Sequence, residues 1–158
     1  MHEYLDDFDG YEKLAAAIVL CAAQDYREAY GKIYFYNGLN DFEKGKQAII
    51  EKIKTIRAKE KELLDEKEQA KNEKRSRHYY GKKISKELNE KPTKLYLLLQ
   101  MVYKEDRKYS NYLNEIDSFN EFIHSDWYDI ISTINGDFLK RSMEKDARNG
   151  NIKGFNGI

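Results

Sequence analysis

The segment YEKLAAAIVLCAAQDYREAYGKI at residues 11–33 decides the fold of this chain. Its apolar residues recur at steps of three and four, which is the spacing of one face of an α-helix. They predict a helix over residues 9–34, with Asp9 as the N-cap and Glu12 completing a weak capping-box pattern three residues later. The Ala-rich middle of this segment would let a second helix approach closely. The residues on the predicted face are Phe8, Tyr11, Leu14, Ala15, Ile18, Val19, Ala22, Tyr26, Ala29, Tyr30 and Ile33.

A second, charge-dense helix is predicted from Phe42 to about Arg75. Asn37-Gly38 is typical of a helix end, and Asn40 or Asp41 can cap the helix that follows. In a coiled coil, two positions of each seven-residue repeat form the seam between the helices. In this helix the first of these positions is apolar at every repeat, whereas the second is apolar only at Ile53. Half a seam predicts a helix that lies against one neighbour, rather than a strong coiled coil. The two sets are Phe42, Ile49, Ile56, Leu63 and Ala70, and Lys46, Ile53, Glu60 and Lys67.

The second half of the chain continues the helical spacing. Pro92 favours the first turn of a helix, so residues 83–92 are predicted as a short separate helix that precedes a longer one over 93–116. Phe119 to Ile134 continues the pattern, with a bend at Ser125-Asp126, which is a good cap pair.

A short last helix is predicted to begin with Phe138, Leu139 and Met143, because Asn135-Gly136 is expected to end the helix before it. No segment shows the alternation of a strand. The sequence therefore predicts an all-α fold, a helical bundle with one long charged helix. We expect one domain over residues 1–147 and a flexible tail over 148–158. Cys21 and Trp127 are both expected to be buried in the core.

Composition limits the classes of function. The chain has 158 residues, 35% of them charged, and a formal net charge of zero, so attraction to a polyanion must come from local clusters. A single cysteine excludes an internal disulfide. The N-terminus is acidic, unlike a signal peptide, and no apolar run approaches the roughly 20 residues of a membrane span. We expect a soluble, intracellular protein with no membrane partner.

Catalytic and metal-binding motifs are not recognisable. Glu121 and His124 form one Glu-x-x-His pair, but a di-iron site of the ferritin-like kind needs a second pair and two further glutamates. No nucleophile elbow, phosphate-binding loop or dinucleotide motif occurs. The sequence predicts no catalytic residues, no metal, no cofactor and no enzymatic activity.

The segment NEKRSRHYYGKKISK at residues 72–86 is the strongest candidate site. The window 71–86 holds seven Lys and Arg residues against one acid, Glu73. Cations mixed with tyrosines are the pattern of a nucleic-acid or nucleotide site, but they can equally bind an acidic protein or form a solvated helix end. We expect a basic-aromatic turn region in which Gly81 lets cations on both sides converge. The predicted contact residues are Arg75, Arg77, Tyr79, Tyr80, Lys82 and Lys83.

Two segments carry a resemblance to a known group of proteins. LAAAIVLCAAQDYREA (14–29) resembles the A-I-V-x-x-A-x-x-D-Y-R-x-A stretch of small helical proteins of phages, prophages and conjugative elements of Gram-positive bacteria. FNEFIHSDWYDIISTINGDFLKRSM (119–143) resembles their C-terminal pattern, F-x-x-S-x-W followed by D-G-x-x-L. The matching residues are Phe122, Ser125, Trp127, Gly136 and Leu139, with Asn135 in place of the usual Asp.

The resemblance implies a setting rather than a chemistry, because this family has no established activity. Residues 40–115 lie outside it and can be an insertion that extends the helical core. Small proteins of mobile elements often act by binding, so we expect an anti-CRISPR-like inhibitor of a bacterial host defence, acting in the host cytoplasm on a protein or protein–RNA target. Direct binding of nucleic acid or a signalling nucleotide is the alternative, and a homodimer is compatible with both.

Overall fold

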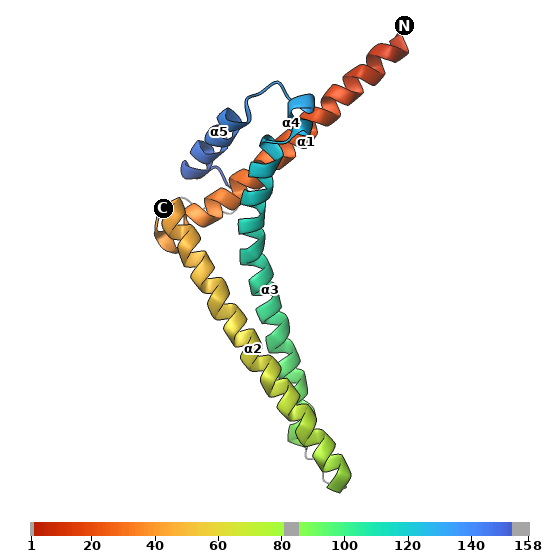
Figure 1. Cartoon of the computed structure of the whole chain (residues 1–158), viewed down its shortest axis with the longest axis vertical. Coiled ribbons are helices and arrows are strands. Elements are labelled where there is room, and N and C mark those ends of the chain that lie inside the picture. Colours follow the sequence, from red (N-terminus) through yellow and green to blue (C-terminus); the bar gives the residue numbers. More distant parts are fainter. Residues whose placement is uncertain (1, 81–85, 153–158) are drawn as a thin grey trace. The chain divides into compact units, whose positions relative to one another are not determined.

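The computed structural model describes the backbone of residues 2–80 and 86–152 and the side chains of residues 10–73 and 93–152. Every regular element in these ranges is helical, which confirms the all-α prediction (Figure 1). The elements are α1 (His2–Tyr34), a short 3-10 helix η1 (Tyr36–Gly38), α2 (Phe42–Tyr80), α3 (Lys86–Ile123), α4 (Asp126–Ile131) and α5 (Gly136–Arg148).

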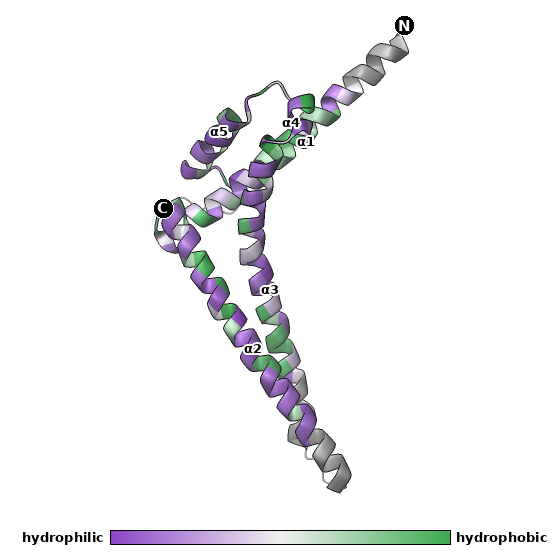
Figure 2. Cartoon of the chain, viewed as in Figure 1, coloured by the Kyte–Doolittle hydropathy of each residue, from purple (hydrophilic) through white to green (hydrophobic). Residues whose placement is uncertain are grey.

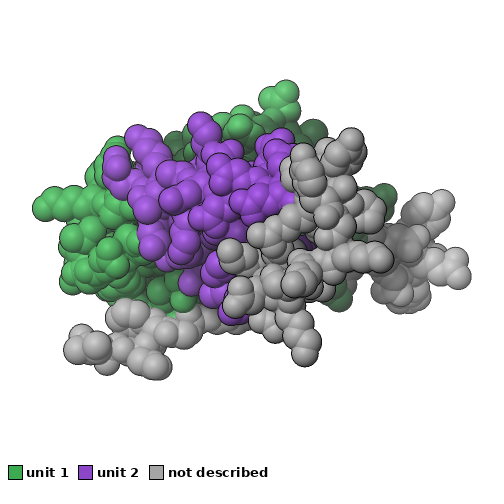
Figure 3. Space-filling model, turned by 90° about the horizontal axis from the view of Figure 1, so that it is seen from below, with its two compact units in different colours: residues 1–48, 111–158 green, residues 49–110 purple. Residues whose placement is uncertain are grey.

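The chain forms two compact units (Figure 3). Unit 1 contains Met1–Ala48 and Asn111–Ile158, and unit 2 contains Ile49–Ser110. The helices α2 and α3 each begin in one unit and end in the other without interruption. The prediction of a single domain over residues 1–147 did not include this division.

The start of α1 differs from the prediction, whereas the start of α2 agrees with it. Helix α1 begins at His2, so Asp9 lies inside the helix and is not its N-cap. After α1, the backbone takes positive φ angles at Asn37, Gly38 and Asn40, which ends the helical path. The Asp41 carboxylate then accepts a hydrogen bond from the backbone N–H of Lys44 at 3.0 Å. Asp41 is therefore the N-cap of α2.

Stacked aromatic rings hold α1 in the core of unit 1. The ring of Tyr26 stacks on Phe119 of α3, with centroids 4.3 Å apart. One turn further along α1, Tyr30 stacks on Phe42 of α2 at 4.5 Å. Tyr26, Tyr30 and Phe119 are all buried, so aromatic side chains contribute much of the apolar surface that is buried at these contacts.

The same tyrosines connect α1 to α5 through their hydroxyl groups. The Tyr26 hydroxyl donates to Glu144 Oε1 at 2.6 Å, and Arg148 Nη1 donates to the Tyr30 hydroxyl at 3.3 Å. Burial, followed by the hydrogen bond to Glu144, raises the pKa of Tyr26 far above that of a free tyrosine. The hydroxyl therefore stays protonated and keeps its role as a donor.

Two cap residues shape the segment from α3 to α5. Ser125 Oγ accepts from the backbone N–H of Tyr128 and caps α4, in agreement with the predicted bend. Asn135 Oδ1 accepts from the N–H of Phe138, so Asn135 begins α5. The prediction that Asn135-Gly136 ends a helix was wrong, because the side chain of Asn135 accepts from the helix that follows it. Helix α4 already ends at Ile131.

Two residues expected in the core lie at the surface. Trp127 is 51% exposed, whereas its neighbour Tyr128 is 1% exposed and donates its hydroxyl hydrogen to the Ile134 carbonyl at 2.9 Å. Ser125 sets the start of α4, and from that start the helix turns residue 128, not 127, into the core. Cys21 is also exposed, because it lies on the side of α1 opposite the buried Tyr26.

Unit 2 is an antiparallel pair formed by parts of α2 and α3. Ile56 and Leu63 of α2 pack with Leu99 and Val102 of α3, and all four are buried. The half-seam prediction for α2 is therefore confirmed: Ile49, Ile53, Ile56 and Leu63 are buried, while Lys67 is exposed. In Figure 2 the hydrophobic residues of α2 alternate with long hydrophilic stretches.

Helix α3 is one helix where two were predicted. It begins at Lys86 and runs through Pro92 without a break. Pro92 lies in the second turn, where its missing N–H removes only one hydrogen bond near the helix start. Packing of the long helix against α2 outweighs this loss.

Candidate partner-binding surface

The basic-aromatic stretch lies largely on helix α2 rather than in a turn. The backbone of α2 is helical through Tyr80, so Arg75, Arg77, Tyr79 and Tyr80 occupy its last two turns. Arg75 and Tyr79 are four residues apart, as are Lys71 and Arg75, which places the three positions along one side of the helix. Lys82, Lys83 and the predicted break at Gly81 lie outside the residues that the structure describes.

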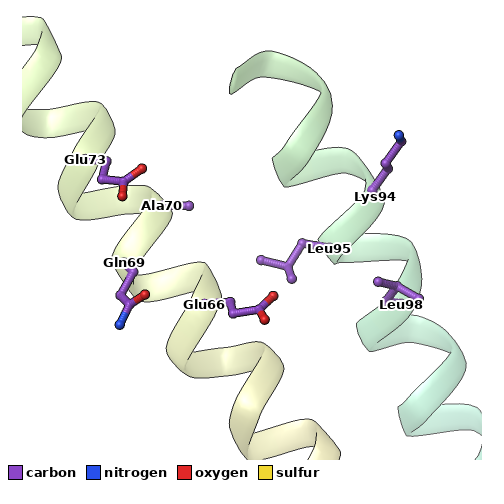
Figure 4. Close-up of a pocket in the computed structure, with 7 residues that line it drawn as sticks. All are labelled: Glu66, Gln69, Ala70, Glu73, Lys94, Leu95 and Leu98. Carbon is purple, nitrogen blue, oxygen red and sulfur yellow. The ribbon is translucent and has the colours of Figure 1, made fainter. Parts of the chain in front are cut away.

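A pocket of about 420 Å³ lies between α2 and α3 just before this stretch (Figure 4). Helix α2 lines it with Glu66, Gln69, Ala70 and Glu73, and α3 contributes Lys94, Leu95 and Leu98. In Figure 4, Leu95 points toward α2 while Lys94 points away from it. The α2 wall is acidic, so the pocket would repel the anionic partner that the basic stretch predicts.

The two acidic residues of α3 between residues 93 and 110 turn toward α2. Glu105 pairs with Lys52 at 3.6 Å, and Asp106 pairs with Arg57 at 3.5 Å. They are the only acids between residues 93 and 110 of the sequence. Over residues 93–110, their inward position leaves Lys and Arg as the charged residues on the opposite side of α3.

Large apolar side chains are exposed on that opposite side. Met101 is 67% exposed, Leu97 57%, Tyr96 56% and Tyr103 42%. Leu97 and Met101 lie one helical turn apart, and Tyr96 and Tyr103 lie two turns apart, so each pair shares a side of the helix. The exposed Gln100 lies between the two rows. Several large apolar side chains exposed on one helix favour an interaction site.

Three cations continue the same two rows. Lys104 and Lys108 follow Leu97 and Met101 at steps of three and four, and Arg107 follows Tyr103. Lys108 Nζ lies 5.6 Å from the ring centroid of Tyr109, which is cation–π distance. We call this surface the outer α3 face. Its residues are Tyr96, Leu97, Met101, Tyr103, Lys104, Arg107 and Lys108.

A larger groove, of about 740 Å³, lies within unit 1. One wall is α1, including Ala15, Val19 and Ala23, and the other comes from α4, α5 and the segment between them, including Leu139 and Met143. Glu12 is the only charged residue among those that line it. The groove offers apolar surface but few of the polar groups that orient a small-molecule ligand.

The Glu121–His124 pair is not part of a metal site in the described residues. His124 Nδ1 lies 2.7 Å from the Asn120 carbonyl oxygen, and its Nε2 lies 3.4 Å from Asp137 Oδ1. No group of three or more His, Cys, Asp or Glu residues in the described part of the chain could hold a metal ion. The same residues contain no helix that is long and apolar enough to cross a membrane.

Comparisons of this chain with models of protein families, with curated proteins and with solved structures give no match. The residues themselves must therefore support any functional conclusion.

The outer α3 face was not predicted from the sequence, because its segment is apolar on every side of the helix. In YLLLQMVY (96–103) seven of eight residues are apolar, so periodicity cannot show which side turns inward. The signal that could have shown it was the pair Glu105-Asp106. These acids form ion pairs across the hairpin with cations of α2, on the side of α3 that buries Leu99 and Val102.

Proposed function

We propose that this protein is a non-enzymatic binding protein of phage or mobile-element origin that inhibits a bacterial host defence system. The observation that supports the proposal most is the outer α3 face, which combines exposed tyrosines, Met and Leu with Lys and Arg. Tyr, Met and Arg are enriched in protein interfaces relative to the rest of a protein surface. The resemblance of residues 14–29 and 119–143 to mobile-element proteins supports the biological setting.

The target is a host protein or a protein–RNA complex with an acidic surface. The outer α3 face carries Lys104, Arg107 and Lys108, and the last turns of α2 carry Arg75 and Arg77, all in unit 2. Opposite charge on the target would increase the association rate, and the apolar side chains would slow dissociation. The target is expected to be in the host cytoplasm.

Phage plating tests the proposal. A phage that carries this gene should plate better than its deletion mutant on cells with an active CRISPR or signalling-based defence, and equally well on cells without it. Met101→Lys and the pair Arg75→Glu with Arg77→Glu should each lower plating on defended cells by tenfold or more. Lys59→Glu, a charge reversal at an exposed position elsewhere on α2, is the matched control. Equal plating of deletion mutant and parent on every defended strain would refute the proposal.

Binding of nucleic acid or a signalling nucleotide is the second candidate. It is favoured by the spacing of Lys71, Arg75 and Tyr79, which would place two cations and an aromatic ring along a single strand of nucleic acid. In a mobility-shift assay with RNA, DNA and cyclic nucleotides, affinity should then fall steeply with salt. Tyr79→Ala should cost about 1–3 kcal/mol of stacking. An affinity that changes neither with salt concentration nor in the Tyr79→Ala variant would exclude this candidate.

A further inference from the structure

Helix α1 has a second apolar face that no described residue covers. From Leu14 to Ala23 the sequence LAAAIVLCAA holds ten consecutive apolar residues, so this part of the helix is apolar all round. A helix of that kind is normally buried on every side. Here one side packs in unit 1, through Val19, Ala23 and Tyr26, while the other is exposed.

Four residues form the exposed side. Leu14, Ala17, Ile18 and Cys21 follow one another at steps of three, one and three, which places them together on α1. Leu14 is 59% exposed, Ala17 and Cys21 are exposed, and Ile18 is partly buried. We call them the second α1 face.

The second α1 face is a bounded patch. On the C-terminal side, the same side of the helix continues with Gln24, Asp25 and Glu28, and on the N-terminal side with Gly10 and Lys13. The helix therefore returns to the usual polar surface at both ends. Among the described residues, nothing covers the two turns between them.

We propose that the second α1 face pairs with the same face of a second copy of this chain, with the two helices antiparallel. In that arrangement residue i of one copy lies opposite residue 35 − i of the other. Leu14 then meets Cys21, and Ile18 meets Ala17. Every larger side chain faces a smaller one, which is the condition for close packing of two helices.

Charge favours the antiparallel direction over the parallel one. Residues 3–12 of the sequence contain five acids, Glu3, Asp6, Asp7, Asp9 and Glu12, and no Lys or Arg. Parallel helices would place these acidic segments side by side. Antiparallel helices place each of them along residues 23–32 of the other copy, where Arg27 and Lys32 balance Asp25 and Glu28, so the repulsion between the two acidic segments is avoided.

A second copy fits this patch better than a foreign partner does. The four residues carry no charge and no side-chain hydrogen-bonding group other than the weak thiol, so they offer nothing that would select a different protein. A twofold pair, by contrast, needs only self-complementarity. Two turns of one helix bury less than the roughly 1,200 Å² of a standard interface, so the dimer should dissociate on dilution.

Sedimentation velocity of the full-length protein over a range of concentrations tests the proposal. The wild type should shift from monomer to dimer as concentration rises, and Leu14→Lys should remain a monomer. Leu20→Lys is the matched control, because Leu20 is 58% exposed on the same helix but lines the groove of unit 1 instead. Circular dichroism and thermal melting verify that both variants fold.

Cysteine cross-linking tests the direction of the helices independently. Residues 14 and 21 of one copy lie about 10 Å apart along the helix, too far for an internal disulfide. Leu14→Cys, with the native Cys21, should give covalent dimers on oxidation with copper phenanthroline, and peptide mapping should find links between residues 14 and 21. The wild type and the double variant Leu14→Cys with Cys21→Ala should remain uncross-linked.

Three results would overturn the proposal. One is a monomer at every concentration. Another is a dimer that Leu20→Lys dissociates and Leu14→Lys does not, which would assign the interface to the groove. The third is efficient Cys21–Cys21 cross-linking in the wild type, which would require parallel helices.

Discussion

At Gly45, α2 packs tightly against the backbone of α1. A Cβ atom at this position would collide with the backbone carbonyl oxygen of Ile33, which cannot move aside as a side chain can. Ile33 is fully buried. Gly45→Ala should therefore destabilise the protein by about 1–3 kcal/mol, even though alanine favours the helix by about 1 kcal/mol. Thermal or urea unfolding of the variant measures the effect.

Gly10 is the matched control for this substitution. It also lies inside a helix, but a Cβ atom there would meet nothing within 4 Å. Gly10→Ala should thus leave stability unchanged or raise it by up to about 1 kcal/mol. If both alanine variants gained stability, the close contact between α1 and α2 at Gly45 would be wrong.

Glu115 should make stability depend weakly on pH. Partial burial, and then repulsion from Asp25, raises the pKa of its carboxyl group above the ordinary value, but the residue is exposed to solvent, which screens the effect. Because the folded state binds this proton more tightly than the unfolded state, ionisation of Glu115 costs stability as pH rises through the folded pKa. Glu115→Gln should raise the melting temperature at pH 7, and the gain should disappear below the ordinary carboxyl pKa.

Glu121→Gln serves as the control for the pH series, since Glu121 is another exposed glutamate of the same helix. It should change the melting temperature little at either pH. A gain from Glu115→Gln that stayed constant between pH 3 and pH 7 would show that the carboxyl charge is not its cause.

At the scale of elements, neighbouring leucines of α2 have opposite surroundings. Leu63 is 7% exposed and packs with Leu99 and Val102, whereas Leu64 is 40% exposed. Leu63→Ala should cost about 2–5 kcal/mol, because it removes buried methyl groups and leaves a cavity. Leu64→Ala should cost clearly less. Urea unfolding of the two variants compares them directly, and equal losses would contradict the observed rotation of α2.

The sequence was enough to predict elements with a single apolar stripe and a clear cap. The seven-residue repeat of apolar residues in α2 indicates its buried side, and Asp41 and Ser125 cap the helices that they were expected to cap. Prediction failed where two adjacent residues were equally apolar. Trp127 and Tyr128 differ by one position, and only the start of α4 decides which of them is buried.

The candidate surface was harder to predict than the helices. The basic stretch is visible as composition, but whether α2 ends before or after it depends on cooperative helix growth along the hairpin, which local breaking signals cannot show. The outer α3 face depends on the rotation of α3, which is set by long-range packing of Leu99 and Val102 against α2.

At the scale of the whole molecule, segments of the two units should differ in their resistance to local opening. Residues 26–33 of unit 1 include four buried apolar residues, Tyr26, Ala29, Tyr30 and Ile33, whereas residues 56–63 of unit 2 include two, Ile56 and Leu63. Amides with few buried contacts around them exchange through local opening. Backbone amides of residues 26–33 in unit 1 should therefore exchange with deuterium more slowly than those of residues 56–63 in unit 2.

Hydrogen exchange followed by mass spectrometry at several times measures this difference. The experiment needs no substitution, and the two segments compared have equal length and are both helical. Identical protection of the two segments would mean that the chain opens as one cooperative unit.

The seven-residue repeat of α2 also affects how such a protein can evolve. Because buried residues recur at Ile49, Ile56 and Leu63, loss or gain of seven residues in α2 and seven in α3 leaves the same side chains facing each other. Each such step changes both helices by about 10 Å and leaves unit 1 untouched. The length of the hairpin can thus change during evolution without rebuilding the rest of the fold.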